Sequence, residues 1–567
     1  MADDQNKLLS EYLERLKNNY AELPEKPSFE AAPEHTVMLP MRDGVKLYTV
    51  CRTPVGKGPF PTIVMRSCYP MQECFYRLHA QEYCRRGFAF VYQFCRGTGN
   101  SEGEWVPNIN ERSDGKDTLD WLDRLDWTES IGYTGCSYLA FTGWVIADIV
   151  PPKVKTLYLT HYGTNRFTSA YSNGLFRQDV LTAWAMENAG FPVTTDYLES
   201  ARYRPQINVD KDLWGKEIPW YRDWITNTNR TDAYWQSGFW KELSEIPGKV
   251  SLPLYIGSGW YDHHLGSTLK TYEALSPESR KHSVLRIGAW NHAFQPCVDH
   301  IENSHLENND EKNAFVWFDQ ILRKKELPEG GVRTYRIGDD RWETYPSYPF
   351  TGSSKTSLYF SRHTHDENSH FLLEKQDDHE TSVTYTYDPD RPVMSHGAES
   401  LLRTWDEIGS LSQPPCSWRD DVVSFVSQPL EKEIDLLGKI TVKLYVSSSA
   451  DDTAFTAKLM EVYPDGKACN IRSGITTLAY RSGEEQPRGS YEAGTIVEAD
   501  IPMWDISWRL HKGSRLRVDI SSSDFPQYAV HTNNAGIWAL QKEAKTAKQT
   551  LYCGSVFSSQ VILPVKE

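Results

Sequence analysis

The ten cysteines of this 567-residue chain include no C-x-x-C pair, the spacing that zinc ribbons and dithiol redox sites use. They are scattered from Cys51 to Cys553 rather than gathered in clusters. This distribution argues against a disulfide framework and against a structural zinc site. It predicts a protein of the reducing cytoplasm.

Positive charge and long apolar runs are also scarce. Asp and Glu number 76 against 61 Lys and Arg, which gives a formal net charge of −15. An acidic balance argues against nucleic acid or an anionic membrane surface as a partner. No run approaches the roughly 18 apolar residues that a membrane-spanning helix needs. We therefore expect neither nucleic acid nor membrane among the partners.

The first residues have neither the basic region nor the apolar region of a secretory signal peptide. Apolar residues there, among them Leu13, Leu16 and Tyr20, instead recur at helical spacing. This periodicity predicts an amphipathic helix within residues 1–30. The helix is a candidate contact for a homodimer.

The rest of the chain is too long for a single core and divides into zones of different periodicity. Short apolar runs alternate with helical stretches over residues 31–164 and 250–344, which is typical of a mostly parallel sheet covered by helices. Residues 165–249 lack this alternation and are predicted to form a helical cap inserted between core strands. Over residues 345–567 the apolar period becomes two, which predicts a C-terminal jelly roll. The predicted fold class is α/β.

The stretch around Ser137 joins a strand-like run to a helical run. Small residues two before and three after the serine, Gly135 and Ala140, permit the tight turn of a nucleophile elbow. Such a turn lifts Oγ above the sheet and leaves the next backbone N–H free. The motif departs from G-x-S-x-G because Leu139 occupies the second glycine position. By itself it equally fits a βα turn with a capping serine, and we interpret the adjacent Cys136 as a packing residue.

Two later strands end in residues suited to activate a serine. A serine hydroxyl is a poor nucleophile until a base removes its proton, and a carboxylate best orients that base. Asp262 follows an apolar run downstream of Ser137, and His292 follows the next such run. This order of serine, acid and histidine is that of α/β-hydrolases. A helix-capping Asp262 and a structural His292 are the alternative interpretations.

Two further histidines, His263 and His264, follow Asp262 and raise the alternative of a metal site. Neither an H-E-x-x-H motif nor a third ligand at a suitable spacing accompanies them. We therefore predict no metal at this site. The serine chemistry needs no organic cofactor either.

The motifs together resemble those of the X-Pro dipeptidyl-peptidase (S15) and cocaine esterase (CocE/NonD) family of serine hydrolases. Five segments match in order and kind: Arg66–Tyr69, Cys95–Trp105, Gly135–Ala140, Gly259–Asp262 and Gly288–His292. The resemblance implies an α/β-hydrolase core with a helical cap insertion and a C-terminal jelly-roll domain. It also implies Ser137, Asp262 and His292 as the catalytic triad. Ala140 in place of the usual glycine and Phe94 in place of an aspartate are departures outside the triad.

The resemblance further implies an oxyanion hole and a substrate pocket. The family's oxyanion donors are a tyrosine hydroxyl after an early core strand and the backbone N–H after the nucleophile, which match Tyr69 and Tyr138. Tyr69 also fits a turn tyrosine before Pro70. Aromatic cap residues contact the acyl group in the family's esterases, and the approximately corresponding positions are Tyr171 and Trp184. Packing between cap and core is the alternative for both.

The resulting prediction is a serine hydrolase that cleaves a small acyl ester or amide through an acyl-enzyme. X-Pro dipeptidyl-peptidase, α-amino-acid ester hydrolase and acyltransferase share this machinery and remain alternatives. Recognition of a free α-ammonium needs carboxylates near the acyl site, for which Asp179 and Glu187 are candidates. A non-catalytic scaffold whose jelly roll binds carbohydrate is the alternative from another class. The expected partner is a small-molecule ester or amide.

Overall fold

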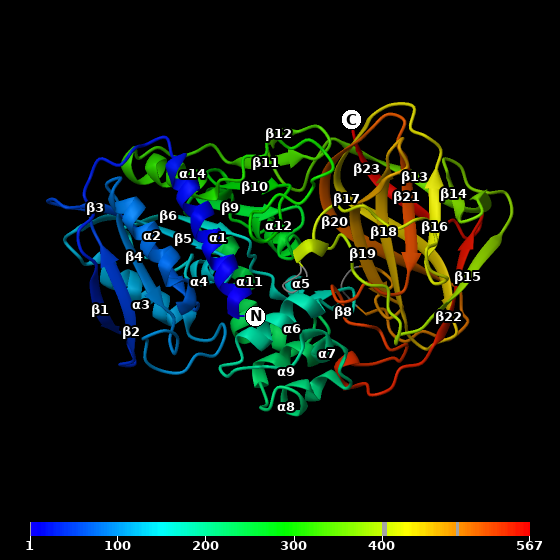
Figure 1. Cartoon of the computed structure of the whole chain (residues 1–567), viewed down its shortest axis with the longest axis horizontal. Helices are drawn as coiled ribbons and strands as arrows, with labels where there is room; N and C mark the ends of the chain where they lie inside the picture. The colour runs from blue at the N-terminus through cyan, green and yellow to red at the C-terminus, as the bar shows by residue number, and fades with distance from the viewer. Residues whose placement is uncertain (1, 400–404, 484–486) are drawn as a thin grey trace.

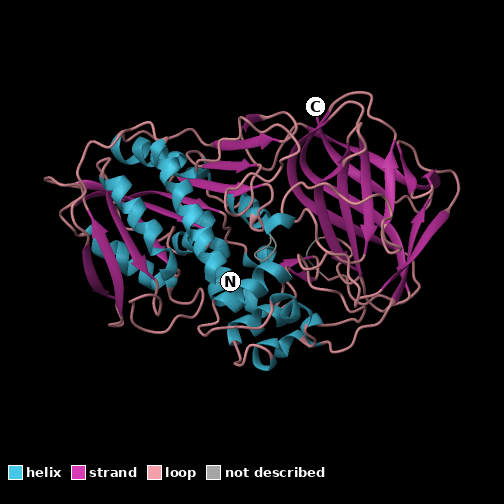
Figure 2. Cartoon of the chain, viewed as in Figure 1, coloured by secondary structure: helices cyan, strands magenta, loops and turns pink. Residues whose placement is uncertain are grey.

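The computed structural model describes residues 2–399, 405–483 and 487–567. An α/β core, blue to green in Figure 1, lies beside a C-terminal β-rich domain, yellow to red, and a small helical unit lies below their junction. Figure 2 shows that the helices are concentrated in the core and in this unit. The predicted α/β core and β-rich C-terminal domain are confirmed.

A ten-stranded sheet in the order β1-β2-β4-β3-β5-β6-β9-β10-β11-β12 forms the centre of the core. Its strands are β1 (His35–Pro40), β2 (Lys46–Arg52), β3 (Phe60–Ser67), β4 (Ala89–Phe94), β5 (Thr128–Cys136), β6 (Val154–Thr160), β9 (Leu254–Gly259), β10 (Val284–Gly288), β11 (Gly331–Arg336) and β12 (Arg341–Tyr345). In this sheet order, the strands from β4 to β11 run parallel to one another. The edge strands β1 and β2 on one side and β12 on the other pair antiparallel with their neighbours. Strands β4 and β9 are buried along their whole length, which explains their continuous apolar runs.

Helices cover both faces of this sheet. They are α1 (Ala2–Ala21), α2 (Glu73–Cys84), α3 (Glu111–Asp123), α4 (Tyr138–Trp144), α12 (Leu265–Glu273), α13 (Pro277–Arg280) and α14 (Asp310–Phe318). The expected N-terminal helix is α1, which packs against α2 and α14 and buries Leu16 and Tyr20. In the described part of the chain no helix combines the length and apolarity needed to cross a bilayer. The ten cysteines are free thiols, and a homodimer contact through α1 stays a prediction.

The cap region contains short helices and one small hairpin. Its elements are α5 (Arg166–Ala170), β7 (Tyr171–Ser172), β8 (Leu175–Phe176), α6 (Gln178–Glu187), α7 (Tyr197–Arg202), α8 (Val209–Asp212), α9 (Pro219–Thr226), α10 (Ala233–Gln236) and α11 (Gly238–Glu245). The hairpin departs from the helical expectation. It turns at Asn173 and Gly174, whose φ values of 42° and 91° suit a two-residue hairpin turn.

The C-terminal domain is built on an eleven-stranded sheet. Its strands are β13 (Ser353–Asp366), β14 (Ser369–Leu373), β15 (Thr381–Tyr387), β16 (Val423–Ser427), β17 (Ile434–Ser448), β18 (Ala454–Val462), β19 (Ala468–Thr477), β20 (Val497–Leu510), β21 (Arg515–Ser521), β22 (Ala547–Cys553) and β23 (Gln560–Lys566). Apart from β14–β16, the pairs are antiparallel. The jelly-roll topology and the domain boundaries at residues 30, 164, 249 and 344 stay predictions.

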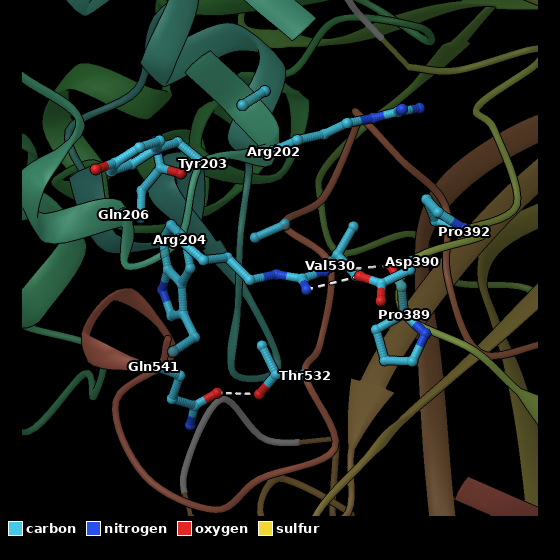
Figure 3. A pocket seen from close by; sticks show the side chains of 13 residues that line it. Arg202, Tyr203, Arg204, Gln206, Pro389, Asp390, Pro392, Val530, Thr532 and Gln541 are labelled. Atoms are coloured by element: carbon cyan, nitrogen blue, oxygen red, sulfur yellow. Dashed lines mark hydrogen bonds and ion pairs between the residues drawn. The ribbon is translucent and has the colours of Figure 1, made fainter. Parts of the chain in front are cut away.

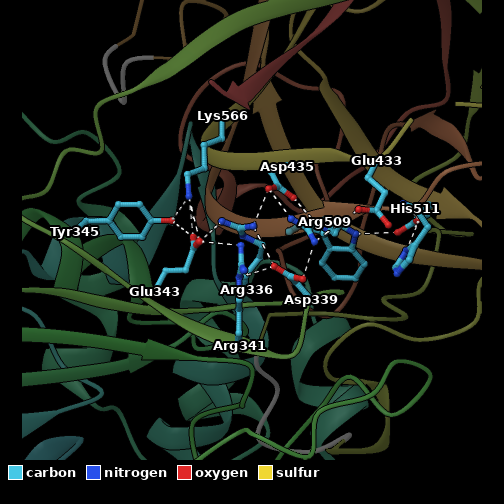
Figure 4. A network of polar contacts seen from close by, with 12 residues as sticks. Arg336, Asp339, Arg341, Glu343, Tyr345, Glu433, Asp435, Arg509, His511 and Lys566 are labelled. Atoms are coloured by element: carbon cyan, nitrogen blue, oxygen red, sulfur yellow. Dashed lines mark hydrogen bonds and ion pairs between the residues drawn. The ribbon is translucent and has the colours of Figure 1, made fainter. Parts of the chain in front are cut away.

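A network of ion pairs, shown in Figure 4, joins the core to this β-domain. Arg336 of β11 lies 2.7 Å from Asp435 of β17, which also pairs with Arg509 of β20 at 2.7 Å. Glu343 of β12 pairs with Arg336 and, at 3.0 Å, with Lys566 of β23. Because Arg336 is buried, loss of a partner leaves its charge poorly compensated.

Replacing Glu343 with glutamine is expected to lower Tm at neutral pH by about 2–4 °C. Burial opposes ionisation, but hydrogen bonds from Tyr345, Lys566 and Arg336 lower the pKa of Glu343 to about 2, from 4.5. A depressed pKa contributes stability that is complete above the unfolded value and is lost as the pH falls toward the folded value. The Tm values of the variant and the wild type should therefore converge as the pH falls from about 4.5 to about 2. Parallel Tm profiles, like those expected for the exposed control Glu492→Gln, would contradict this coupling.

Candidate active site

Ser137 occupies the sharp turn between β5 and α4. Its φ is 58° and its ψ is −127°, a conformation that a non-glycine residue adopts only when its surroundings enforce it. Gly135 permits the turn, because a Cβ there would lie 2.2 Å from the carbonyl oxygen of Leu139. The Ser137 side chain makes no capping hydrogen bond to α4. Its Oγ lies 2.9 Å from Nε2 of His292, which excludes the capping-serine interpretation.

Asp262 and His292 follow β9 and β10, which are neighbouring parallel strands. The carboxyl ends of parallel strands share one edge of the sheet, so both side chains reach the elbow. Nδ1 of His292 lies 2.8 Å from Oδ1 of Asp262, and the hydroxyl of Ser258 donates to Oδ2 at 2.9 Å. The N-cap residue of α12 is His264. The buried Asp262 carboxylate therefore orients the histidine ring and is not the helix cap.

Three further imidazoles, those of His161, His263 and His264, surround this pair. The ring centroids of His161 and His263 lie 5.4 Å and 4.4 Å from that of His292. Burial lowers the pKa of His161 to about 3 and the pKa values of His263 and His264 well below the usual range. All three are uncharged at neutral pH. Burial alone would raise the pKa of Asp262, but His292 holds it well below its usual value.

Asp262, His263 and His292 each offer a metal-ligating atom, and these atoms lie within 4.8 Å of one another. However, Oδ1 of Asp262 and Nδ1 of His292 already share a hydrogen bond. A metal ion between them would displace the shared proton and interrupt the path to Ser137. The arrangement suits proton transfer directly, and a site without metal stays our prediction.

Tyr69 and Tyr138 lie beside the elbow, with ring centroids 6.4 Å apart and edge to face. The Tyr69 hydroxyl accepts a hydrogen bond from Nε1 of Trp184 at 3.0 Å, so its own proton can serve another acceptor. Tyr138 is the first residue of α4, where a backbone N–H has no partner within the helix. The side-chain hydroxyl of Tyr138 accepts from the N–H of Asn108 and donates to Glu111. The two expected oxyanion donors are thus a side-chain hydroxyl and a backbone amide.

The two predicted substrate residues lie at different depths in the cap. Trp184 of α6 stacks on Tyr138, with ring centroids 6.0 Å apart and planes at 16°. Tyr171 is buried in the hydrophobic core of the cap, and its hydroxyl donates to the carbonyl of Trp224 at 2.9 Å. Trp184 therefore adjoins the elbow, whereas Tyr171 is held in the core of the cap by packing and by its hydrogen bond to Trp224.

Three residues that support the site were not found by sequence reasoning. Ser258 at the end of β9 carries no motif. His161 comes directly after β6 with a φ of 53°, and its Nδ1 lies 3.7 Å from Sγ of Cys136. For His161, the position directly after a strand was the only sign in the sequence of a role at the site. Arg15 of α1 donates to the carbonyl of Ala293, the residue after His292, at 3.1 Å.

A separate pocket of about 120 Å³ lies where the cap meets the β-domain (Figure 3). Cap residues around α7 and β-domain loops line it, and Arg204 pairs with Asp390 at 2.8 Å across this junction. The triad residues are not among its lining residues. The pocket is therefore distinct from the Ser137 site.

A serine, a histidine and a carboxylate joined in this way, beyond the strands of a mostly parallel sheet, are the arrangement found in α/β serine hydrolases. Residues 43–294 match the model of the X-Pro dipeptidyl-peptidase S15 family. Residues 326–562 match the model of the X-Pro dipeptidyl-peptidase C-terminal non-catalytic domain. The two matches together span most of the chain, which therefore belongs to the X-Pro dipeptidyl-peptidase (S15) and cocaine esterase family of serine hydrolases.

Individual relatives agree with this assignment. Cocaine esterase of Rhodococcus sp. (strain MB1 Bresler) is 29% identical, and the match covers 93% of this chain and 98% of that protein. An aminopeptidase from the marine sediment archaeon Thaumarchaeota archaeon has a TM-score of 0.80, and an α-amino acid ester hydrolase has 0.77. Both are 19% identical, and each match covers 96% of this chain and 99% of the other. These two structures establish the fold alone.

Proposed function

We propose that the protein hydrolyses small acyl esters or amides through an acyl-enzyme formed on Ser137. The observation that carries the proposal is the continuous chain of contacts from Oγ of Ser137 through His292 to Asp262. The similarity to a cocaine esterase over nearly the whole chain favours an ester as the substrate. The cytoplasmic location stays part of the proposal.

In the proposed reaction, His292 takes the proton of Ser137 while Oγ attacks the carbonyl carbon. The Tyr69 hydroxyl and the backbone N–H of Tyr138 stabilise the oxyanion. His292 then protonates the leaving group, and later activates the water that hydrolyses the acyl-enzyme. The ionised Asp262 keeps the proton of the neutral ring on Nδ1 and stabilises the imidazolium that forms. No step calls for a metal ion or an organic cofactor.

The rings beside the elbow favour an apolar acyl group. Trp105, Tyr138 and Trp184 pack against one another with ring centroids 5.8–6.0 Å apart. The two carboxylates considered for α-ammonium recognition, Asp179 and Glu187, lie at opposite ends of the ten-residue helix α6. They are therefore too far apart to bind one ammonium group together. This favours a simple esterase over the amino-acid-specific alternatives.

A substrate panel tests this proposal. It contains p-nitrophenyl acetate, butyrate and octanoate, a phenylglycine methyl ester, and Ala-Pro-p-nitroanilide. High kcat/KM on the acyl esters supports an esterase, whereas preference for the two α-amino substrates would favour the peptidase or amino-ester alternative. A fluorophosphonate probe should label the peptide that contains Ser137. Folded protein that resists the probe would instead support a non-catalytic scaffold.

Replacing Tyr69 with phenylalanine is expected to lower kcat by about 10²–10³ and to leave KM nearly unchanged, because the hydroxyl acts on the developing oxyanion. Burial raises the pKa of Tyr69, so the hydroxyl stays protonated and able to donate. In the control Trp184→Phe the tyrosine loses one donor but keeps its own proton. The loss there should be about tenfold or less. Unchanged kcat in Tyr69→Phe would remove this residue from the oxyanion hole.

A further inference from the structure

The β-domain contacts the segment that carries Asp262. The hydroxyl of Tyr261 donates to the carbonyl of Ile471 at 3.3 Å, and the guanidinium of Arg472 donates to the carbonyl of Trp260. Both partners belong to β19, a strand of the C-terminal domain. The two residues directly before Asp262 are therefore held by a strand more than two hundred positions away in sequence.

Arg472 is fully buried and spans several elements. Its second terminal nitrogen donates to the carbonyl of Asp505 in β20 at 2.7 Å. The guanidinium lies 5.5 Å from the ring centroid of Tyr261 and 3.9 Å from the carboxylate of Glu399. Its Nε has no hydrogen-bond partner among the described residues. A buried cation that is incompletely paired contributes little to the stability of a fold. The hydrogen bond from Arg472 to the Trp260 carbonyl therefore calls for an explanation other than stability.

The segment that follows Asp262 is held by the same domain. Gly266, in the first turn of α12, packs against the indole of Trp504 in β20, where a Cβ would lie 2.5 Å from the ring. The guanidinium of Arg177 lies 4.0 Å from the centroid of the same Trp504 ring and pairs with Glu399 at 2.9 Å. In Figure 1 β20 lies at the edge of the β-domain that faces α12. Asp262 thus lies between two contacts made by the β-domain.

We propose that the β-domain positions Asp262, the acid of the triad. The positioning residues are Arg472 of the β-domain and Tyr261 of the core. They hold the backbone from Trp260 to Asp262 so that Oδ1 meets Nδ1 of His292. The domain matches a family model described as non-catalytic. A positioning role agrees with that description, because in such a role the residues of the domain touch neither the substrate nor the reacting atoms. The inference rests on the proposed function of Asp262. Small displacements of a catalytic group cost up to about 10² in rate, so the contact has a measurable consequence.

The test compares three variants of the full chain. Arg472→Lys keeps the charge but cannot reach both carbonyls with a planar fork, and Tyr261→Phe removes one hydroxyl. Tyr387→Phe is the matched control, since this buried tyrosine donates to the carbonyl of His531 at 3.0 Å within the β-domain. Fluorophosphonate titration to completion counts the folded sites, and kcat per titrated site is measured with KM and Tm.

We expect kcat per site to fall about 10- to 10²-fold in Arg472→Lys and severalfold in Tyr261→Phe, with KM within about twofold of the wild type. The control should keep its kcat per site even where its Tm falls. A purely structural role would lower Tm and the number of titrated sites while leaving kcat per site unchanged, and that result overturns the inference. If Arg472→Lys does not fold, Tyr261→Phe decides. A wild type with no serine-dependent hydrolysis would instead refute the proposed function.

Discussion

The Ser137→Ala variant is expected to lose about 10⁶-fold in kcat, down to the level that binding and the oxyanion donors alone support. Without Oγ no acyl-enzyme forms, and His292 has no hydroxyl to deprotonate at 2.9 Å. Hydrolysis of p-nitrophenyl acetate gives the rate, and fluorophosphonate labelling should disappear with it. Tm should stay close to the wild-type value, because the serine makes no capping hydrogen bond to α4.

Ser130→Ala is the matched control for this prediction. Ser130 lies on the same strand, β5, is buried, and has no side-chain hydrogen-bond partner in the described part of the chain. Its replacement should leave kcat and labelling unchanged. If Ser137→Ala kept more than about 1% of the wild-type rate, well above the residual activity of triad mutants, another nucleophile would have to be sought.

Asp262→Asn is expected to lower kcat by about 10⁴, because asparagine keeps the shape of the carboxylate but favours the wrong tautomer of His292. The pKa of Asp262 is well below its usual value, because its interactions with His292 outweigh the opposing effect of burial. A depressed pKa means that Asp262 stays ionised down through the ordinary range of carboxylates. The wild-type rate should therefore show no inflection from this group near pH 4.

Ser258→Ala separates the orientation of Asp262 from its charge. The variant removes the hydrogen bond to Oδ2 and leaves the bond from Oδ1 to His292 in place. Its expected loss is about 10- to 10²-fold at most, since one hydrogen bond to a charged group contributes about 1.5–3 kcal/mol. Equal losses in Ser258→Ala and Asp262→Asn would mean that the position of the carboxylate, rather than its charge, limits the rate.

The candidate site was largely predictable because each member lies at the end of an apolar run. The ends of strands can be recognised in a sequence, and the carboxyl ends of parallel strands lie at one edge of the sheet. The sequence therefore predicted that Ser137, Asp262 and His292 lie close together. The α/β core and the β-rich C-terminal domain followed from the change of apolar period. The short hairpin at Asn173 was missed, since strands of two residues have no period to detect.

By itself the sequence determined the order of the zones, the strand ends that carry the serine, the acid and the histidine, and the family. Local periodicity and short motifs are sufficient for these, because neighbouring residues enforce them. Only the tertiary structure decided which side chains from distant segments support the site. The contacts of Arg472 with Trp260, of Trp184 with Tyr69 and of Arg15 with Ala293 join segments about 115 to 280 residues apart. Such contacts depend on how domains pack, and packing leaves no local pattern in the chain.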